Sequence, residues 1–388
     1  KIAEIVSHIL DFAMKARASD IHVEPQEKST RVRYRIDGIL QEKLTIPKEL
    51  HDALVSRIKI LSGMKIDEKR VPQDGRFNFK AGDNVVDLRV SSLPTTWGEK
   101  IVLRLLKKSG GVPELTELGL RGRGLKNLED AILRPHGIVI ICGPTGSGKT
   151  TTLYSLISKI STPKVNIVTL EDPVEYKIPG VNQVQINPAA GLTFASGLRS
   201  LLRQDPNIIL VGEIRDKETA DLAIQAALTG HLVFSTLHTN NASGALPRLL
   251  DMGAEPYLLA SSMTAIVAQR VVRKIHDKCK EAYAPDPKIM EDMKNILDSL
   301  WPAGGDGKLY KGKGDAECGD SGYYGRVGIF EVLPITEKIG RLILERAAAG
   351  DIEKIAREEG MITLKQDGYL KVLEAVTSIE EVLRVAQE

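Results

Sequence analysis

A chain of 388 residues exceeds the length that one hydrophobic core usually holds, so at least two domains are expected. Hydrophobic residues make up 42% and charged residues 27% of the chain, proportions typical of a globular protein that exclude a disordered or fibrous one. The net charge is only +2, which lacks the strongly basic character of a nucleic-acid-binding protein, so no nucleic-acid partner is expected.

Cysteine content and hydrophobicity indicate the compartment. Three cysteines (Cys142, Cys279 and Cys318) are too few for a disulfide framework and favour a reducing, cytoplasmic environment. No apolar run reaches the roughly 18 residues that a membrane-spanning helix requires. Because the sequence begins at Lys1 without a methionine or a signal peptide, we expect a soluble chain that is truncated upstream.

Residues 1–107 predict a small α+β domain. Apolar residues at helical spacing predict an amphipathic helix over 1–16, and a second helix is expected near 48–62. Alternating or β-branched stretches predict strands at 21–23, 30–36, 85–90 and 101–105. A charged, glycine-rich stretch follows, and we assign residues 108–118 as a linker.

Residues 119–255 predict an α/β core. Helical stretches alternate with apolar strands, as a mostly parallel sheet requires, and the strands are expected at 137–142, 167–170, 208–211 and 232–235. Strand signals fade after residue 255. We therefore expect a mostly helical region over 256–388, with an insertion at 276–318.

The first strand of this core runs into a complete G-x-x-x-x-G-K-T pattern, which consists of Gly143, Pro144, Thr145, Gly146, Ser147, Gly148, Lys149 and Thr150 and is followed by Thr151 in the predicted helix. Glycines let backbone N–H groups close around phosphates, and the helix N-terminus and Lys149 add positive potential. The Thr150 hydroxyl suits Mg²⁺, which prefers oxygen ligands. Strand, loop and helix together predict binding of ATP with Mg²⁺.

Polar residues also follow other strands of the core, where ligands bind in open α/β sheets. Glu213 ends an apolar strand in the form of a Walker B strand and is the candidate general base; the alternative is a surface acid at a strand end. Glu171 and Asp172 suit water positioning or Mg²⁺. His231 and His238 could bind the nucleotide, with His238 sensing the γ-phosphate. Read singly, each histidine is more simply a structural hydrogen bonder.

Taken together, these segments resemble the motifs of the secretion ATPase superfamily, in order and at the same spacing. The phosphate-binding loop, 170–176, 202–216 and 230–240 resemble its Walker A motif, Asp box, Walker B motif and His box. Segments on both sides resemble the type II secretion and type IV pilus assembly ATPases, namely 18–25, 35–38, 72–76, 88–100, 269–270 and 322–331. The resemblance therefore covers essentially the whole chain.

This resemblance implies the fold class: a RecA-like phosphate-binding-loop ATPase core with a mostly parallel sheet, preceded by a PAS-like α+β domain and followed by a helical region. It also implies a homo-hexamer that hydrolyses ATP to power assembly of type IV pili or type II secretion pseudopili. Such a motor is expected to be cytoplasmic and peripheral to the inner membrane, where it contacts a platform protein.

The resemblance further implies that arginines of the N-terminal domain approach the phosphates, and Arg76, Arg89 and Arg104 match that role. Arginine suits it because the guanidinium stays charged and offers a bidentate fork to phosphate oxygens. Without the resemblance, arginines on strand faces are simply solvated.

One departure from the family concerns zinc. Assembly ATPases often carry two C-x-x-C pairs that bind Zn²⁺. Here His276 and Cys279 stand at the spacing of one pair, and Asp315 and Cys318 at the spacing of the other. All four side chains can ligate zinc, so a mixed site is one interpretation; a lost site held by packing, with free thiols, is the other. The insertion is basic, which a solvated loop explains better than contact with an anionic membrane.

Two rival functions stay open. A pilus retraction or DNA-transport ATPase would share every nucleotide motif, although the upstream segments and 322–331 argue against retraction. A catalytically silent scaffold that binds nucleotide is a different class of protein, and the intact Lys149 and Glu213 oppose it. The sequence does not separate pilus assembly from type II secretion.

Overall fold

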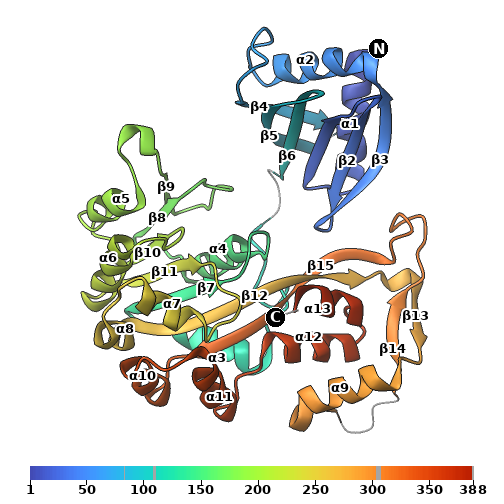
Figure 1. Ribbon diagram of the computed structural model, residues 1–388. Coiled ribbons are helices and arrows are strands. Elements are labelled where there is room, and N and C mark those ends of the chain that lie inside the picture. The colour runs from blue at the N-terminus through green and yellow to red at the C-terminus, as the bar shows by residue number, and fades with distance from the viewer. Residues whose placement is uncertain (83, 108–110, 303–306, 387–388) are drawn as a thin grey trace. The chain divides into compact units, whose positions relative to one another are not determined.

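The computed structural model describes residues 1–82, 84–107, 111–302 and 307–386 (Figure 1). The chain divides into two compact units, Lys1–Gly111 and Val112–Glu388. The division falls within the predicted linker 108–118, of which 108–110 lie outside the described residues. Among the described residues, no helix combines the length and the apolar character needed to cross a membrane.

The first unit is a six-stranded antiparallel sheet with two helices. Its elements in chain order are α1 (Ile2–Lys15), β1 (Asp20–Pro25), β2 (Ser29–Ile36), β3 (Ile39–Pro47), α2 (His51–Leu61), β4 (Gln73–Ala81), β5 (Asn84–Thr95) and β6 (Gly98–Lys107). The strands lie in the order β3-β2-β1-β6-β5-β4. Both predicted helices and all four predicted strands are confirmed, and the sheet gains β3 and β4.

Both helices of the first unit pack on one face of its sheet. Leu10 of α1 and Ile58 of α2 share a buried cluster with Val32, Leu88 and Leu103 of the strands. Because side chains alternate along a strand, the other face carries the polar residues. That face is where the predicted arginines lie.

A seven-stranded, mostly parallel sheet forms the centre of the second unit. Its strands are β7 (Gly137–Cys142), β8 (Ile167–Glu171), β9 (Asn182–Gln185), β10 (Ile208–Val211), β11 (Leu232–Leu237), β12 (Met263–Ile275) and β15 (Tyr323–Pro334). They lie in the order β15-β12-β7-β11-β10-β8-β9, and every neighbouring pair is parallel except β12 with β15. The four predicted core strands are confirmed as β7, β8, β10 and β11.

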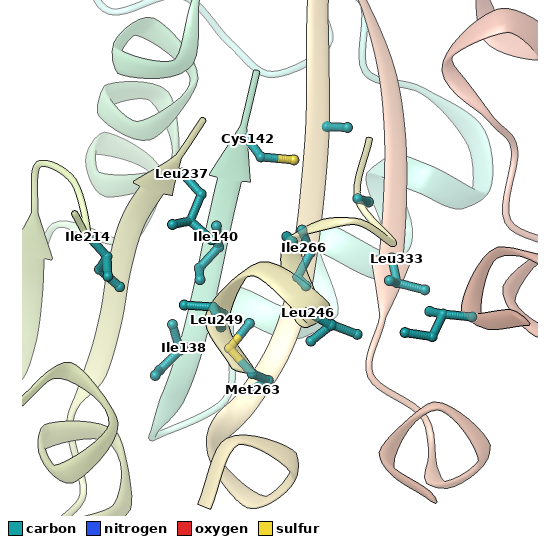
Figure 2. Close-up of a cluster of buried hydrophobic side chains, with 14 of the residues drawn as sticks. Ile138, Ile140, Cys142, Ile214, Leu237, Leu246, Leu249, Met263, Ile266 and Leu333 are labelled. Carbon is teal, nitrogen blue, oxygen red and sulfur yellow. The ribbon is translucent and has the colours of Figure 1, made fainter. Parts of the chain in front are cut away.

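Helices cover both faces of this sheet. Those of the second unit are α3 (Gly122–Ile132), α4 (Lys149–Ile160), α5 (Phe194–Leu201), α6 (Lys217–Leu228), α7 (Ala245–Asp251), α8 (Pro256–Ser262), α9 (Pro287–Leu297), α10 (Glu337–Leu344), α11 (Ala349–Glu358), α12 (Leu364–Leu373) and α13 (Ile379–Val385). Figure 2 shows one face, where Ile138 and Ile140 of β7 lie with Leu246 and Leu249 of α7. On the other face, residues of β7 pack with α3 and α4. This arrangement confirms the predicted α/β class.

The chain after residue 255 is helical from Glu337 onward, as expected, but it also supplies two long strands that the sequence did not reveal. β12 has 13 residues and β15 has 12, and both join the central sheet. The first seven residues of β12 are all buried, so its sequence lacks the alternation by which a strand is recognised. The insertion adds a small two-stranded sheet of β13 (Lys280–Tyr283) and β14 (Leu309–Gly312).

Candidate nucleotide-binding site

Most of the predicted nucleotide residues gather where four neighbouring parallel strands end. β7 runs into the phosphate-binding loop, and its neighbour β11 runs into His238. β10, the next strand, leads to Glu213, and β8 ends at Glu171. Parallel strands present their carboxyl ends at one edge of the sheet, so segments far apart in the sequence meet there.

The phosphate-binding loop closes around its own lysine. The Lys149 Nζ atom donates hydrogen bonds to the carbonyl oxygens of Gly143 at 2.7 Å and of Pro144 at 2.9 Å. Gly143 and Gly148 have φ angles of 153° and 87°, in the region that favours glycine, so the loop can turn sharply before α4. Burial lowers the pKa of the Lys149 ammonium, and the negative charge of Glu213 opposes that shift. Phosphate oxygens would replace the two carbonyls as acceptors.

The remaining loop residues leave an approach from solvent. Pro144, Thr145 and Gly146 are exposed, while Ser147 is buried. Thr150 and Thr151 are half-buried in the first turn of α4, which begins at Lys149. The free N–H groups of this first turn and the Thr150 hydroxyl are therefore placed for a phosphate group and its Mg²⁺.

One carboxylate oxygen of Glu213 is bound by the protein, and the other is available to act as a base. Its side chain is buried, with 9% of the residue exposed, and the Arg215 guanidinium donates to Oε1. Oε2 has no hydrogen-bond partner among the described residues; His238 Nε2 lies 3.5 Å away without hydrogen-bond geometry. Thr236 of β11 fixes the start of this segment by donating its hydroxyl to the Gly212 carbonyl at 2.6 Å. A buried, unpaired carboxylate oxygen can accept a proton from water.

Glu171, in contrast, is held by protein groups on both oxygens. The Tyr154 hydroxyl of α4 donates to Oε2, and Thr169 donates to Oε1 at 2.6 Å. Gln183 of β9 adds a bond to Oε1 at 3.3 Å. Burial and the neighbouring carboxylate raise the pKa of Tyr154, so its phenol stays protonated as a donor. Glu171 therefore joins α4 to the end of β8, and exposed Asp172 is the acid of this segment that remains open to solvent.

The structure does not bring His231 to this edge. His231 immediately precedes β11, and its backbone oxygen accepts from Gly137 at the start of β7. The six residues of β11 separate it from the carboxyl edge, about 20 Å of strand. Its Nδ1 atom lies 2.8 Å from the Ala226 carbonyl, as expected for a structural hydrogen bonder. The predicted strand at 232–235 already lay between His231 and His238, and the structure shows that it places the two residues at opposite ends of β11.

Arg76, Arg89 and Arg104 form a row across the polar face of the first unit. Arg76 of β4 is directly opposite Arg89 of β5, which is directly opposite Arg104 of β6. Arg104 is in turn opposite Asp20 of β1 and donates to it at 2.9 Å. Like charges directly opposite one another destabilise a sheet, and the Asp20 carboxylate offsets this repulsion at the Arg104 end of the row.

The four residues of the predicted mixed zinc site lie together in the second unit. His276, Cys279, Asp315 and Cys318 each offer a ligand atom, and these atoms are all within 4.8 Å of one another. His276 is buried, and its Nδ1 lies 3.0 Å from an Asp315 carboxylate oxygen without a hydrogen bond. Backbone N–H groups of Asp315 and Gly322 donate to Cys318 Sγ at 3.2 and 3.3 Å. Such amide-to-sulfur bonds orient and stabilise a metal-binding thiolate.

Sequence reasoning missed three residues that support the site. Tyr154 holds Glu171, as described above. Gln269 and Arg270 of β12 were noted only as part of the family resemblance, yet both contact segments of the nucleotide edge. Their signal in the sequence is the Gln-Arg pair that interrupts an apolar run, and that pair by itself indicates no contact with the phosphate-binding loop.

Comparison with known proteins places the chain among secretion proteins. The model of the family described as "Type II/IV secretion system protein" matches residues 1–384. The "Type IV pilus assembly ATPase PilB" of Thermus thermophilus is 47% identical over 380 residues, 98% of this chain and 42% of that protein. The "Type II secretion system protein E" of Pseudomonas aeruginosa is 47% identical over 387 residues, 100% of this chain and 76% of that protein. The chain thus spans less than half of the first relative and about three quarters of the second.

Solved structures agree on the fold. The crystal structure of "the Pilus Retraction Motor PilT and Bound ADP" is similar with a TM-score of 0.63 at 26% identity, covering 98% of this chain and 96% of that one. The Legionella pneumophila ATPase DotB is similar with a TM-score of 0.70 at 22% identity, covering 98% and 95%. These similarities, together with the sheet order, confirm the α/β ATPase fold.

Proposed function

This chain belongs to the type II/IV secretion system protein family, and we propose that it is an ATPase that works as a hexameric motor for assembly of a type IV pilus or a type II secretion pseudopilus. The observation that carries the proposal is the buried, unpaired Oε2 of Glu213 at the same sheet edge as the phosphate-binding loop. A retraction motor would share this edge, but the relatives at 47% identity are named for assembly and secretion.

Some of these residues would bind the nucleotide, and others would activate the attacking water. Lys149 and the N–H groups of the loop bind the β- and γ-phosphates, and Thr150 would hold Mg²⁺, which neutralises charge on the phosphate oxygens when bound. Glu213 Oε2 accepts a proton from the attacking water. His238, whose Nε2 lies 3.5 Å from that oxygen, would sense the γ-phosphate from its place beside the base.

The arginine row of the first unit supplies the second half of the proposed site. Arg76, Arg89 and Arg104 lie side by side across β4, β5 and β6, and their guanidinium groups would add positive charge to that of Lys149. In a ring, this row would face a nucleotide that is bound at a phosphate-binding loop of the assembly. Charge from the row would stabilise the transition state and make hydrolysis depend on the arrangement of the units.

We place the motor at the cytoplasmic face of the inner membrane, in contact with a platform protein. Support comes from the named functions of the relatives and from the cytoplasmic supply of ATP. Motions of one unit against the other would then be transmitted to that partner.

Native mass spectrometry tests the ring. With ATP and Mg²⁺ present, we expect a species of six copies, because a site completed by a second subunit needs closed symmetry. The same measurement without nucleotide is the control and should show fewer hexamers. A chain that stays monomeric with saturating ATP would contradict the motor proposal.

We further propose that His276, Cys279, Asp315 and Cys318 bind one Zn²⁺. The donor set fits: two sulfurs, an imidazole nitrogen and a carboxylate oxygen converge, and the Nδ1 atom of buried His276 has no hydrogen-bond partner among the described residues. His276 follows β12 and Cys318 precedes β15, and the insertion between them contains β13 and β14. A bound metal would therefore link the two ends of this insertion.

Replacing Cys318 by Ser should release the metal and lower the melting temperature by about 5 °C, because a structural zinc site stabilises only the folded state. Metal content by mass spectrometry and thermal unfolding measure the two effects. Asp277→Ala is the matched control, since this exposed acid lies in the same segment but outside the cluster. If the purified chain contained no zinc and the C318S variant had the melting temperature of wild type, the four residues would be a packed cluster that binds no metal.

A further inference from the structure

We infer that Gln269 and Arg270 of β12 are positioning residues for hydrolysis: Gln269 sets the shape of the phosphate-binding loop, and Arg270 holds the segment that carries His238. The inference rests on the proposed hydrolysis at Glu213 and deepens it. Neither side chain is assigned a chemical step.

The register of β12 places the two residues beside the nucleotide edge. Ala268 pairs with Cys142, the last residue of β7, so Gln269 is level with the start of the phosphate-binding loop. Successive side chains of a strand point to opposite faces. Gln269 therefore lies on the face covered by α4, where Val267 packs, and Arg270 on the face where Ala268 packs. One dipeptide thus contacts the site from both faces of the sheet.

Gln269 contacts the loop at both of its ends. Its Oε1 accepts a hydrogen bond of 2.7 Å from Thr152 of α4, and both side chains are buried. A Cβ atom on Gly148 would lie 2.8 Å from Gln269 Nε2, and one on Gly143 would lie 2.6 Å from the Gln269 carbonyl oxygen. The first and last glycines of the loop therefore pack directly on Gln269. Without the Gln269 side chain, Gly148 would lose a packing contact and Thr152 a hydrogen bond. The backbone N–H groups of the loop would then no longer be held in a fixed orientation.

Arg270 contacts the loop that follows β11. Its Nη2 donates to the Asn240 carbonyl at 3.0 Å and to the Asn240 Oδ1 at 3.4 Å, while Nη1 donates to the Gln269 carbonyl at 3.3 Å. Asn240 is two residues after His238. Glu331 of β15 adds support by accepting from the Ala242 N–H at 2.8 Å. β12 and β15 thus fix the chain that follows His238, and His238 in turn lies beside Glu213.

The two positions should affect different kinetic quantities. The loop contacts the phosphates before and during reaction, so a disturbed loop weakens nucleotide binding. The His238 segment lies beside the base, so its displacement slows the chemical step while the loop still grips the nucleotide. A purely structural role would not separate the two effects.

The test measures binding of fluorescent mant-ATP and steady-state ATP hydrolysis with the full chain. Gln269→Ala should raise the Kd for mant-ATP about 10-fold while kcat at saturation changes less than about 3-fold, the scale of one or two buried hydrogen bonds. Arg270→Gln should lower kcat about 10-fold and leave the Kd within about 3-fold, and Arg270→Lys should restore part of kcat because it can still donate to Asn240.

Controls separate positioning from loss of folding. Lys274→Ala, an exposed residue of the same strand, should match wild type in both measurements and in its melting temperature. Thr152→Val, which removes only the hydroxyl that Gln269 accepts from, should reproduce the rise in Kd if Gln269→Ala does not fold. Equal proportional losses of binding and kcat in both positions, or no loss in either, would overturn the inference. Failure of the proposed role of Glu213 would be detected separately, because the Glu213→Gln variant would then hydrolyse ATP at the wild-type rate.

Discussion

Glu213→Gln should reduce ATP turnover by about 100-fold to 10,000-fold while the Kd for ATP stays within about 3-fold of wild type. Glutamine keeps the shape and the bond from Arg215, but it has no carboxylate to accept a proton at the position of the unpaired Oε2. The expected variant therefore binds nucleotide and fails to hydrolyse it. Phosphate release measures turnover, and mant-ATP titration measures binding.

Glu218→Gln is the matched control for that prediction. Glu218 is exposed at the start of α6 and pairs with Arg199 of α5, so the same isosteric change removes an acid that is neither buried nor paired with Arg215 and should leave turnover unchanged. Wild-type turnover in Glu213→Gln would show that Glu213 is not the base and would leave it as a buried acid that pairs with Arg215.

Lys149→Ala should weaken ATP binding by at least about 100-fold, and turnover should fall with it. Two charge-assisted hydrogen bonds to phosphate oxygens, each about 1.5 to 3 kcal/mol, account for a loss of that size. The ammonium already points into the loop, where it donates to the carbonyls of Gly143 and Pro144, so it needs no large movement to reach a phosphate. Isothermal titration with ATP and Mg²⁺ measures the change.

Lys159→Ala provides the comparison on the same helix. Lys159 lies in the last turn of α4 and pairs with Glu129 at 3.0 Å, so its loss removes an equal charge without touching the loop. Binding of ATP should stay at the wild-type level. If the two lysine variants bound ATP equally well, nucleotide binding would not depend on the phosphate-binding loop.

Local chemistry accounts for most of what could be predicted. The loop from Gly143 to Thr150, with a strand before it and a helix after it, is a continuous segment whose residue types match its ligand. Glu213 was recognisable for a similar reason, as an acid at the end of a short apolar strand. The structure confirms both strands and places both residues at one edge.

Predictions were less successful where the relevant contact spans the sheet. His231 and His238 are close in sequence, yet β11 separates them, and only His238 is near Glu213. Glu171 looked like a free catalytic acid, yet Tyr154 and Thr169 occupy its oxygens. The predicted strand at 232–235 already implied the separation of the two histidines. The contact of Glu171 with Tyr154 could not be read from spacing, because Tyr154 belongs to another element, α4.

The sequence by itself determined the phosphate-binding loop and thereby the prediction of a nucleoside triphosphate ligand, since such a loop acts through its own backbone and a few adjacent side chains. Only the tertiary structure decided which residues surround that loop. The strand order β12-β7-β11-β10-β8 decides which strands are neighbours. It places Gln269 against the loop and His238 beside Glu213, although other elements lie between the members of each pair in the sequence. Strand order depends on how the buried faces pack against the helices, a property of the whole core that no single motif contains.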